Sequence, residues 1–263
     1  MARNIKLMGL LLLVCGFLQA CESGECREPR DFNERSKKFD ERIHGWLDAA
    51  DAYEMQRENV FKERESLKPE RKKLVKFREA TSSKIIDELI LPDPKVPVVF
   101  AHIDDLQRVN MVYAWKLMDV TMNIHRMFTT EQRQKIKDAM HEPFEPFETP
   151  FLARRAIDYV LLKIDADAPQ KKKVWQMVET TESRANIMLK AQHSNTGAIL
   201  TEWVKHKPEV SEIKGRVNKA SDSIVDFAKV TTKDAISLSK DFKPEQRAFI
   251  NDRMRRMKVC PTK

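Results

Sequence analysis

An internal repeat constrains the fold of this chain more than any other feature of its sequence. The segment Phe128–Ile136, FTTEQRQKI, returns as Phe242–Ile250, FKPEQRAFI, at an offset of 114 residues (242 − 128 = 114). The same offset aligns further identical residues without a gap: Ile43 with Ile157, Leu47 with Leu161, Gln56 with Gln170, Glu88 with Glu202 and Met140 with Met254. One register that holds over so long a stretch predicts a duplicated unit, with copies at residues 43–140 and 157–257.

The fold class follows from residue usage and from the spacing of apolar residues. Only 6 of the 263 residues are glycine and 33% are charged, a composition that favours helices over turn-rich sandwiches and barrels. In the second copy, apolar residues follow the spacing i, i+3, i+4, i+7 of one helix face: Ile157, Val160, Leu161 and Ile164. The sequence Ser-Asn-Thr-Gly at 194–197 predicts a break in the pattern. We therefore predict an all-α fold of two tandem helical units related by a pseudo-twofold.

A linker at 141–156 is predicted to join the two units. It contains three closely spaced prolines, which exclude a continuous helix. Three phenylalanines in the same segment are predicted to attach it to the helices: Phe144, Phe147 and Phe151. A second proline-rich stretch, 91–100, is predicted to be an extended turn that leads into a long helix, with a short strand as the alternative.

The N-terminus has the pattern of an export signal. Residues 1–20 combine two basic residues with an apolar run that is shorter than the ~20 residues of a membrane-spanning helix. The sequence LQAC at positions 18–21 resembles a bacterial lipobox, which predicts cleavage before Cys21 and lipidation of that cysteine. Because Glu22 follows, we expect a periplasmic lipoprotein anchored to the outer membrane, with residues 21–42 as a tether. Ordinary secretion with a free Cys21 is the alternative.

Two further cysteines lie near opposite ends of the mature chain, at Cys26 and Cys260. In an oxidising compartment such a pair can close a disulfide. Both residues lie in terminal segments, and residues 258–263 are predicted to be a tail. A disulfide and two free thiols are therefore both open readings of this pair.

The repeated motif has a mechanical explanation in helix capping. Thr129 and Gln132 have the spacing of a capping box, in which a side-chain oxygen accepts a backbone N–H three residues on and the glutamine reaches back. Asp167 can take the place of the threonine before Gln170. The predicted set of helix-start residues is Gln56, Thr129, Gln132, Asp167, Gln170 and Gln246.

Most enzyme classes lack their sequence signatures in this chain. No G-x-G, P-loop, H-E-x-x-H, G-x-S-x-G or C-x-x-C motif is present, and we predict no enzyme activity and no cofactor. The six histidines are scattered, and Arg255 and Arg256 stand where the first copy has His141 and Glu142, so no metal site is predicted. The net charge is +8, yet the export signal argues against nucleic acid as a partner.

A secreted helical unit with L-T-x-x-Q-like helix starts around a long helix resembles the Spy/CpxP family of periplasmic stress proteins, whose motif is LTxxQ. The best matches are residues 242–246, FKPEQ, and 128–132, FTTEQ. The resemblance implies units that pair into a curved helical cradle, here fused in one chain. It also implies an ATP-independent chaperone for unfolded or misfolded envelope proteins, with a sensor kinase as a further partner.

Clusters of cationic and apolar side chains fit such a client-binding surface, because flexible methionines beside cationic stems accommodate many partners. The predicted residues are Lys171, Lys172, Lys173, Trp175, Met177, Arg253, Met254 and Arg256. Each cluster is equally compatible with a solvated helix face. The alternatives are a metal-binding or stress-sensor-modulating periplasmic protein, and a structural adaptor lipoprotein.

Overall fold

The computed structural model describes residues 32–141 and 143–258, and all the regular structure in these residues is helical. The first half contains α3 (Phe32–Ala49), α4 (Glu54–Ser66), α5 (Lys68–Leu89), α6 (Val96–Met127) and α7 (Thr130–Met140). The second half contains α8 (Phe151–Lys163), α9 (Ala168–Val204), α10 (Val210–Ser239) and α11 (Pro244–Lys258). The predicted all-α fold class is confirmed. Helices α3 and α8 begin inside the predicted tether 21–42 and the predicted linker 141–156, respectively.

Helices of the two halves begin at matching positions. Helix α9 begins 114 residues after α4 (168 − 54), α10 begins 114 after α6 (210 − 96), and α11 begins 114 after α7 (244 − 130). The offset that aligns the sequence therefore also aligns these helix starts. The pseudo-twofold relation between the halves, as a cradle, remains a prediction.

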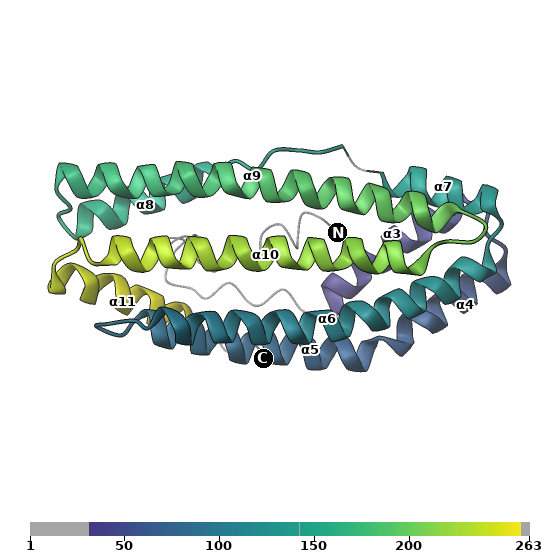
Figure 1. The fold of residues 1–263 in the computed structure, drawn as a ribbon, viewed down its shortest axis with the longest axis horizontal. Helices are drawn as coiled ribbons and strands as arrows, with labels where there is room; N and C mark the ends of the chain where they lie inside the picture. Colours follow the sequence, from purple (N-terminus) through teal and green to yellow (C-terminus); the bar gives the residue numbers. More distant parts are fainter. Residues whose placement is uncertain (1–31, 142, 259–263) are drawn as a thin grey trace.

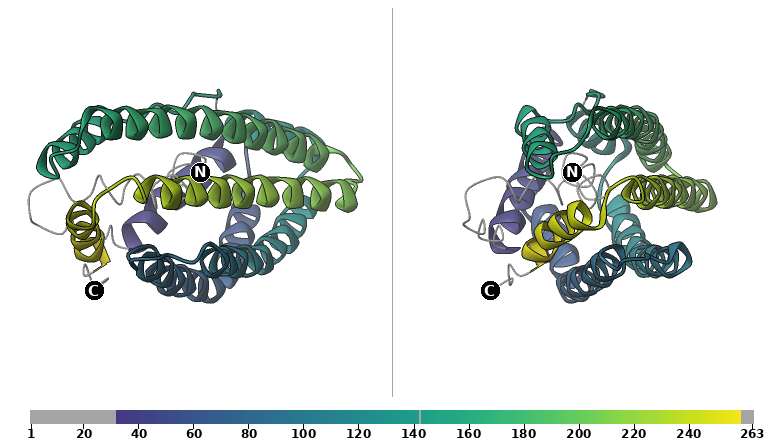
Figure 2. Two further views of the ribbon diagram at one scale, coloured as in Figure 1. Left: turned by 60° about the vertical axis from the view of Figure 1, so that its left-hand side comes forward. Right: turned by 90° about the vertical axis from the view of Figure 1, so that its left-hand side faces the viewer.

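The long helices run along the length of the molecule. In Figure 1, α9, α10 and the α5–α6 pair lie across the view, with α8 and α11 at one end and α3, α4 and α7 at the other. Figure 2 shows that several of these helices curve, and that α6, α9 and α10 lie together on one side of the molecule.

Each end of the molecule has its own hydrophobic core. The core at the α3 end comprises Ile43, Leu47, Ala50, Ala52, Val60, Phe128, Ile136 and Trp203. The core at the α8 end comprises Ile157, Val160, Leu161, Ile164, Ala166, Val178 and Phe242. Five positions correspond at the offset of 114: 43 with 157, 47 with 161, 50 with 164, 52 with 166 and 128 with 242. Burial of each large aliphatic side chain contributes about 1.5–3 kcal/mol, so the repeated apolar positions stabilise both ends.

Helices α3 and α8 end in the same backbone turn. Asp51 and Asp165, which are 114 residues apart, have positive φ angles of 50° and 48°. The next residue in each case donates its backbone N–H back to a leucine carbonyl, Leu47 at 3.0 Å and Leu161 at 2.9 Å. This left-handed residue followed by a backward hydrogen bond reverses the chain into the next helix.

Two local predictions along the long helices were tested by the structure. The predicted break at 194–197 is wrong, because α9 runs unbroken through Gly197, where a glycine costs a helix only about 1 kcal/mol. The first half is instead divided at Leu67, because Pro69 in the first turn of α5 has no N–H to continue α4. Residues 91–95 form a turn into α6, and no strand occurs there.

The segment 143–150 is an extended strap attached to α9. Asn186 pairs with both backbone groups of Phe147, accepting from its N–H at 2.5 Å and donating to its carbonyl at 2.9 Å. The Thr149 hydroxyl donates to Glu182 at 2.8 Å. The side chain of Phe147 packs against the cluster of buried Ala185 and Phe227, so the strap is fixed by both polar and apolar contacts.

Only part of the predicted phenylalanine attachment of this strap is found. Phe147 packs on the helices, and the ring of Phe144 lies 5.9 Å from that of His193. The prediction for Phe151 is wrong, because its side chain is 71% exposed and contacts the guanidinium of Arg155 on its own helix at 5.5 Å.

Candidate functional site

A reciprocal pair of glutamine side chains joins two helix starts in the second half. Gln170 Nε2 donates to Gln246 Oε1 at 3.0 Å, and Gln246 Nε2 donates to Gln170 Oε1 at 3.2 Å. Both residues are buried. Gln170 Nε2 also donates to the carbonyl of Asp241 at 2.8 Å, and Gln246 Nε2 donates to the carbonyl of Ile164 at 2.9 Å. Each buried amide is therefore well satisfied, which burial of a polar group requires.

The same pair recurs in the first half. Gln56 Nε2 and Gln132 Nε2 each donate to the Oε1 of the other at 3.2 Å. Gln56 also donates to the carbonyl of Met127 at 2.6 Å, and Met127 lies 114 residues before Asp241. This pair is half-buried rather than buried. The repeated motif thus places equivalent cross-helix hydrogen bonds at both ends of the molecule.

The helix-start hydrogen bonds are complete at α7 and α9 and partial at α4 and α11. Thr129 Oγ1 accepts from Gln132 N at 3.1 Å, and Asp167 Oδ1 accepts from Gln170 N at 2.8 Å. At α4 the preceding Tyr53 makes no side-chain cap bond. At α11 the preceding residue is a lysine, whose side chain has no acceptor. The glutamines at all four starts accept a backbone N–H: those of Tyr53, Thr129, Asp167 and Lys243, at 2.8–3.1 Å.

The predicted client-binding residues at the start of α9 lie on more than one face of the helix. Lys171, Lys172 and Lys173 are exposed, and Lys173 pairs with Asp241 at 3.0 Å. Trp175 packs against the core at the α8 end and lies 5.7 Å from the guanidinium of Arg154. Residues two positions apart on an α-helix are separated by about 200° around its axis, so Lys173 and Trp175 project from nearly opposite sides of α9.

The remaining members of that predicted set lie on other parts of the second half. Met177 is half-buried on α9. Arg253 and Met254 are half-buried on α11, where the Arg253 guanidinium lies 5.3 Å from the Phe249 ring. The Arg256 side chain lies outside the described residues, as do Cys21, Cys26 and Cys260.

Arg133 lies in the repeated motif but was not predicted as a site residue, yet it makes a dense set of polar contacts where the two halves meet. It is 4% exposed, and its guanidinium donates to the carbonyls of His125 and Phe128 at the end of α6. It also donates to the carbonyls of Val204 at 3.2 Å and Lys205 at 3.4 Å at the end of α9. Burial lowers the pKa of Arg133, but an arginine stays charged, and two helix C-termini attract that charge. We call this contact the α7–α9 joint.

The second half makes a lighter contact in the corresponding place. There Asn251 of α11 donates to the carbonyl of Ile90 at the end of α5, at 2.9 Å. Ile90 lies 114 residues before Val204, so the end of α5 docks on α11 as the end of α9 docks on α7. The repeat equivalent of Arg133, Arg247, is half-buried. We call this contact the α5–α11 joint.

Polar and cation–π contacts connect the two halves midway, between α6 and α10. The ammonium of Lys229 lies 5.6 Å from the Phe100 ring, and that of Lys214 lies 6.0 Å from the Trp115 ring. The two contacts are equivalent in the repeat: Lys214 occupies the position of Phe100 (100 + 114 = 214), and Lys229 occupies the position of Trp115 (115 + 114 = 229). Near the centre, Gln107 donates to Asp222 at 2.8 Å. We call this contact the α6–α10 seam.

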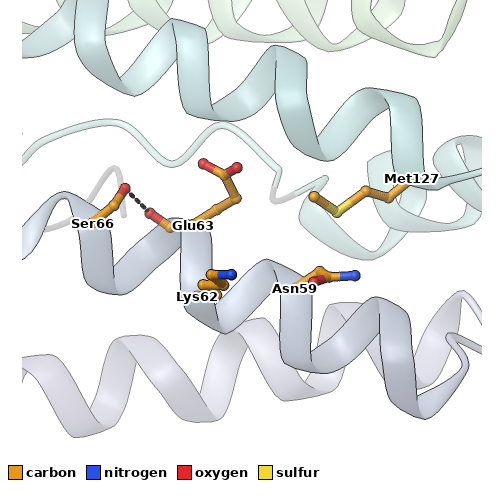
Figure 3. A pocket seen from close by; sticks show the side chains of 5 residues that line it. All are labelled: Asn59, Lys62, Glu63, Ser66 and Met127. Atoms are coloured by element: carbon orange, nitrogen blue, oxygen red, sulfur yellow. Dashed lines mark hydrogen bonds between the residues drawn. The ribbon is translucent and has the colours of Figure 1, made fainter.

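One pocket of about 230 Å³ lies between α4 and the end of α6. Its lining residues are Asn59, Lys62, Glu63, Ser66 and Met127 (Figure 3). In the described part of the chain, no three His, Cys, Asp or Glu side chains gather as a metal site would require. Within the same residues, no helix has both the length and the apolar character of a bilayer crossing.

Comparisons with protein-family models, with curated proteins and with solved structures gave no match.

Proposed function

We propose that this chain is a chaperone-like envelope lipoprotein that binds unfolded proteins without nucleotide, on a basic and apolar helical surface. The lipid anchor at Cys21, the periplasmic location and the Spy/CpxP resemblance belong to this proposal. Its binding partners are unfolded or misfolded envelope proteins.

The α6–α10 seam is the observation that carries the proposal. Its aromatic rings, Phe100 and Trp115, are half-buried beneath lysine side chains. Phe100 also packs on the apolar cluster of Ile85, Val99, Ile103 and Ile236, so Trp115 is the ring of the seam that a client can use. A lysine stem is easily displaced, because a cation–π contact at an exposed site contributes only about 0.5–1 kcal/mol. An apolar client segment can therefore take the place of Lys214 on Trp115 without unfolding the helices.

Exposed positive charge at the start of α9 supports the same function. Lys171, Lys172 and Lys173 are exposed on α9 and add long-range attraction for acidic clients. Such attraction speeds encounter more than it strengthens the final complex. These lysines are therefore proposed to act on the rate of capture, and the seam on the stability of the complex.

The test is aggregation of urea-denatured malate dehydrogenase after dilution, followed by light scattering with and without the purified mature chain and without ATP. We expect suppression at a few-fold molar excess. Trp115→Ala should weaken suppression, and reversal of charge at Lys171, Lys172 and Lys173 should slow capture. Lys190→Glu, an exposed position elsewhere on α9, is the matched control and should behave like the wild type.

Two results would count against the proposal. One is no suppression at several-fold excess by a chain whose circular dichroism shows it to be folded. The other is suppression that needs added zinc, nickel or cobalt, which would favour the metal-binding alternative.

A further inference from the structure

His125 is a buried titratable group inside the α7–α9 joint. It is 5% exposed, and its Nε2 lies 2.9 Å from the carbonyl oxygen of Lys205. Because a carbonyl only accepts, Nε2 carries the proton and the neutral ring leaves Nδ1 unprotonated. The imidazole also lies edge-on to the ring of Trp203, with 6.0 Å between centroids. His125 thus connects the end of α6 to the end of α9.

The charged groups that face His125 are mostly cations. Arg126 on its own helix, Arg133 on α7 and His206 in the α9–α10 turn all disfavour a positive imidazole. Glu202, which precedes Trp203 on α9, is a carboxylate at this helix end, and it is already engaged by Lys205 Nζ at 2.5 Å and by the backbone N–H of Glu209 at 2.7 Å. A protonated His125 would therefore add a second buried cation beside Arg133 with no carboxylate to receive it.

We propose that the α7–α9 joint is an acid-labile contact, in which protonation of His125 at Nδ1 releases the end of α9 from α7 while the α5–α11 joint stays closed. The α5–α11 joint, which occupies the equivalent place in the repeat, serves as a control within the same molecule. The repeat equivalent of His125 is Ser239, and the α5–α11 joint rests on Asn251, which does not titrate. This inference concerns the contact between the halves and does not depend on client binding.

The direction of the pH effect follows from the burial of the ring. Burial, with added repulsion from Arg133 and Arg126, lowers the pKa of His125 below its ordinary value of about 6.5. In the released joint the imidazole is hydrated and has its ordinary pKa, so release takes up a proton. The closed joint is therefore fully stable above about pH 6.5 and loses up to about tenfold in its closing equilibrium per pH unit below that value. The loss ends at the pKa of the closed state.

Native-state hydrogen exchange of the full mature chain between pH 7.5 and 5 tests the proposal, with rates corrected for the intrinsic pH dependence of exchange. The backbone amides of residues 199–204, at the end of α9, should lose protection several-fold below pH 6.5. Residues 85–90 occupy the equivalent place at the end of α5 and should change less than twofold.

Two variants identify the group responsible. His125→Gln keeps an amide N–H for the Lys205 carbonyl but cannot titrate, so its protection at 199–204 should not respond to acid. His206→Gln removes the neighbouring histidine and should respond as the wild type does. If His125→Gln has already lost protection at 199–204 at pH 7.5, the proposal is tested by the wild type and His206→Gln alone. In both proteins, acid should reduce protection at 199–204 and not at 85–90. Constant protection at 199–204 down to pH 5, the same loss in His125→Gln, or equal loss in both segments would overturn the proposal.

Discussion

Replacement of Gln246 by alanine is the sharpest test of the repeated glutamine pairs. Its amide exchanges hydrogen bonds with Gln170 and donates to the carbonyl of Ile164, and it accepts the backbone N–H of Lys243. The variant leaves the amide of Gln170 and the Ile164 carbonyl without these partners in a buried site. An unsatisfied buried polar group costs about 1–3 kcal/mol. We therefore expect Gln246→Ala to lower the free energy of unfolding by about 3 kcal/mol.

The first half supplies the matched comparison. Gln132 makes the equivalent pair with Gln56, but that pair is half-buried and water can replace the lost bonds. Gln132→Ala should therefore cost only about 1 kcal/mol. Urea unfolding followed by circular dichroism at 222 nm measures both free energies.

A double-mutant cycle then isolates the contact between the two glutamines. The double variant Gln170→Ala, Gln246→Ala should lose less free energy of unfolding than the sum of the two single variants, by about 0.5–3 kcal/mol. The second substitution removes an amide that had already lost its hydrogen-bond partner in the first. Equal costs for Gln246→Ala and Gln132→Ala, or additive costs in the cycle, would refute the assignment of the buried pair as a stabilising cross-helix contact.

Three further outcomes are expected from single substitutions. Arg133→Met should destabilise the fold by about 3 kcal/mol, since hydrogen bonds to a charged group contribute about 1.5–3 kcal/mol each, whereas Arg247→Met should cost about 0.5 kcal/mol or less; thermal unfolding compares the two. Asp165→Gly should raise stability by about 0.5 kcal/mol in urea unfolding, because φ is 48° there, while Asp158→Gly inside α8 should lower it. Cys21→Ala should move the protein from the membrane to the soluble fraction; membrane association unchanged by this substitution, with no acyl mass on the wild type, would contradict the predicted anchor.

The helices and their starts could be predicted from the sequence because they rest on local chemistry. The spacing of Thr129 and Gln132 specifies a capping box, and the structure contains its two hydrogen bonds. The apolar face of α8 was likewise visible in the spacing of Ile157 and Leu161, both of which are buried. These features depend on residues three or four apart, a distance at which helix geometry leaves little choice.

Features that depend on contacts between distant residues could not be predicted in the same way. Gln56 and Gln132 were assigned to helix starts, but nothing in their local sequence shows that the two side chains pair across 76 residues. The predicted break at 194–197 failed for a related reason. Local propensity disfavours a helix at Gly197, but packing along α10 keeps α9 helical through this position.

Arg133 and Arg247 show most clearly what a repeat does not determine. Both follow the motif glutamine, and both stand one turn into the helix that ends their half. Only Arg133 is buried, because the carbonyls of Val204 and Lys205 reach its guanidinium. In the other half, Asn251 takes the equivalent carbonyl of Ile90. The two joints are therefore held by different residues, the motif arginine Arg133 in one and Asn251 in the other. One joint depends on a buried cation beside a histidine and the other on a neutral amide, so a change in pH acts on one joint only.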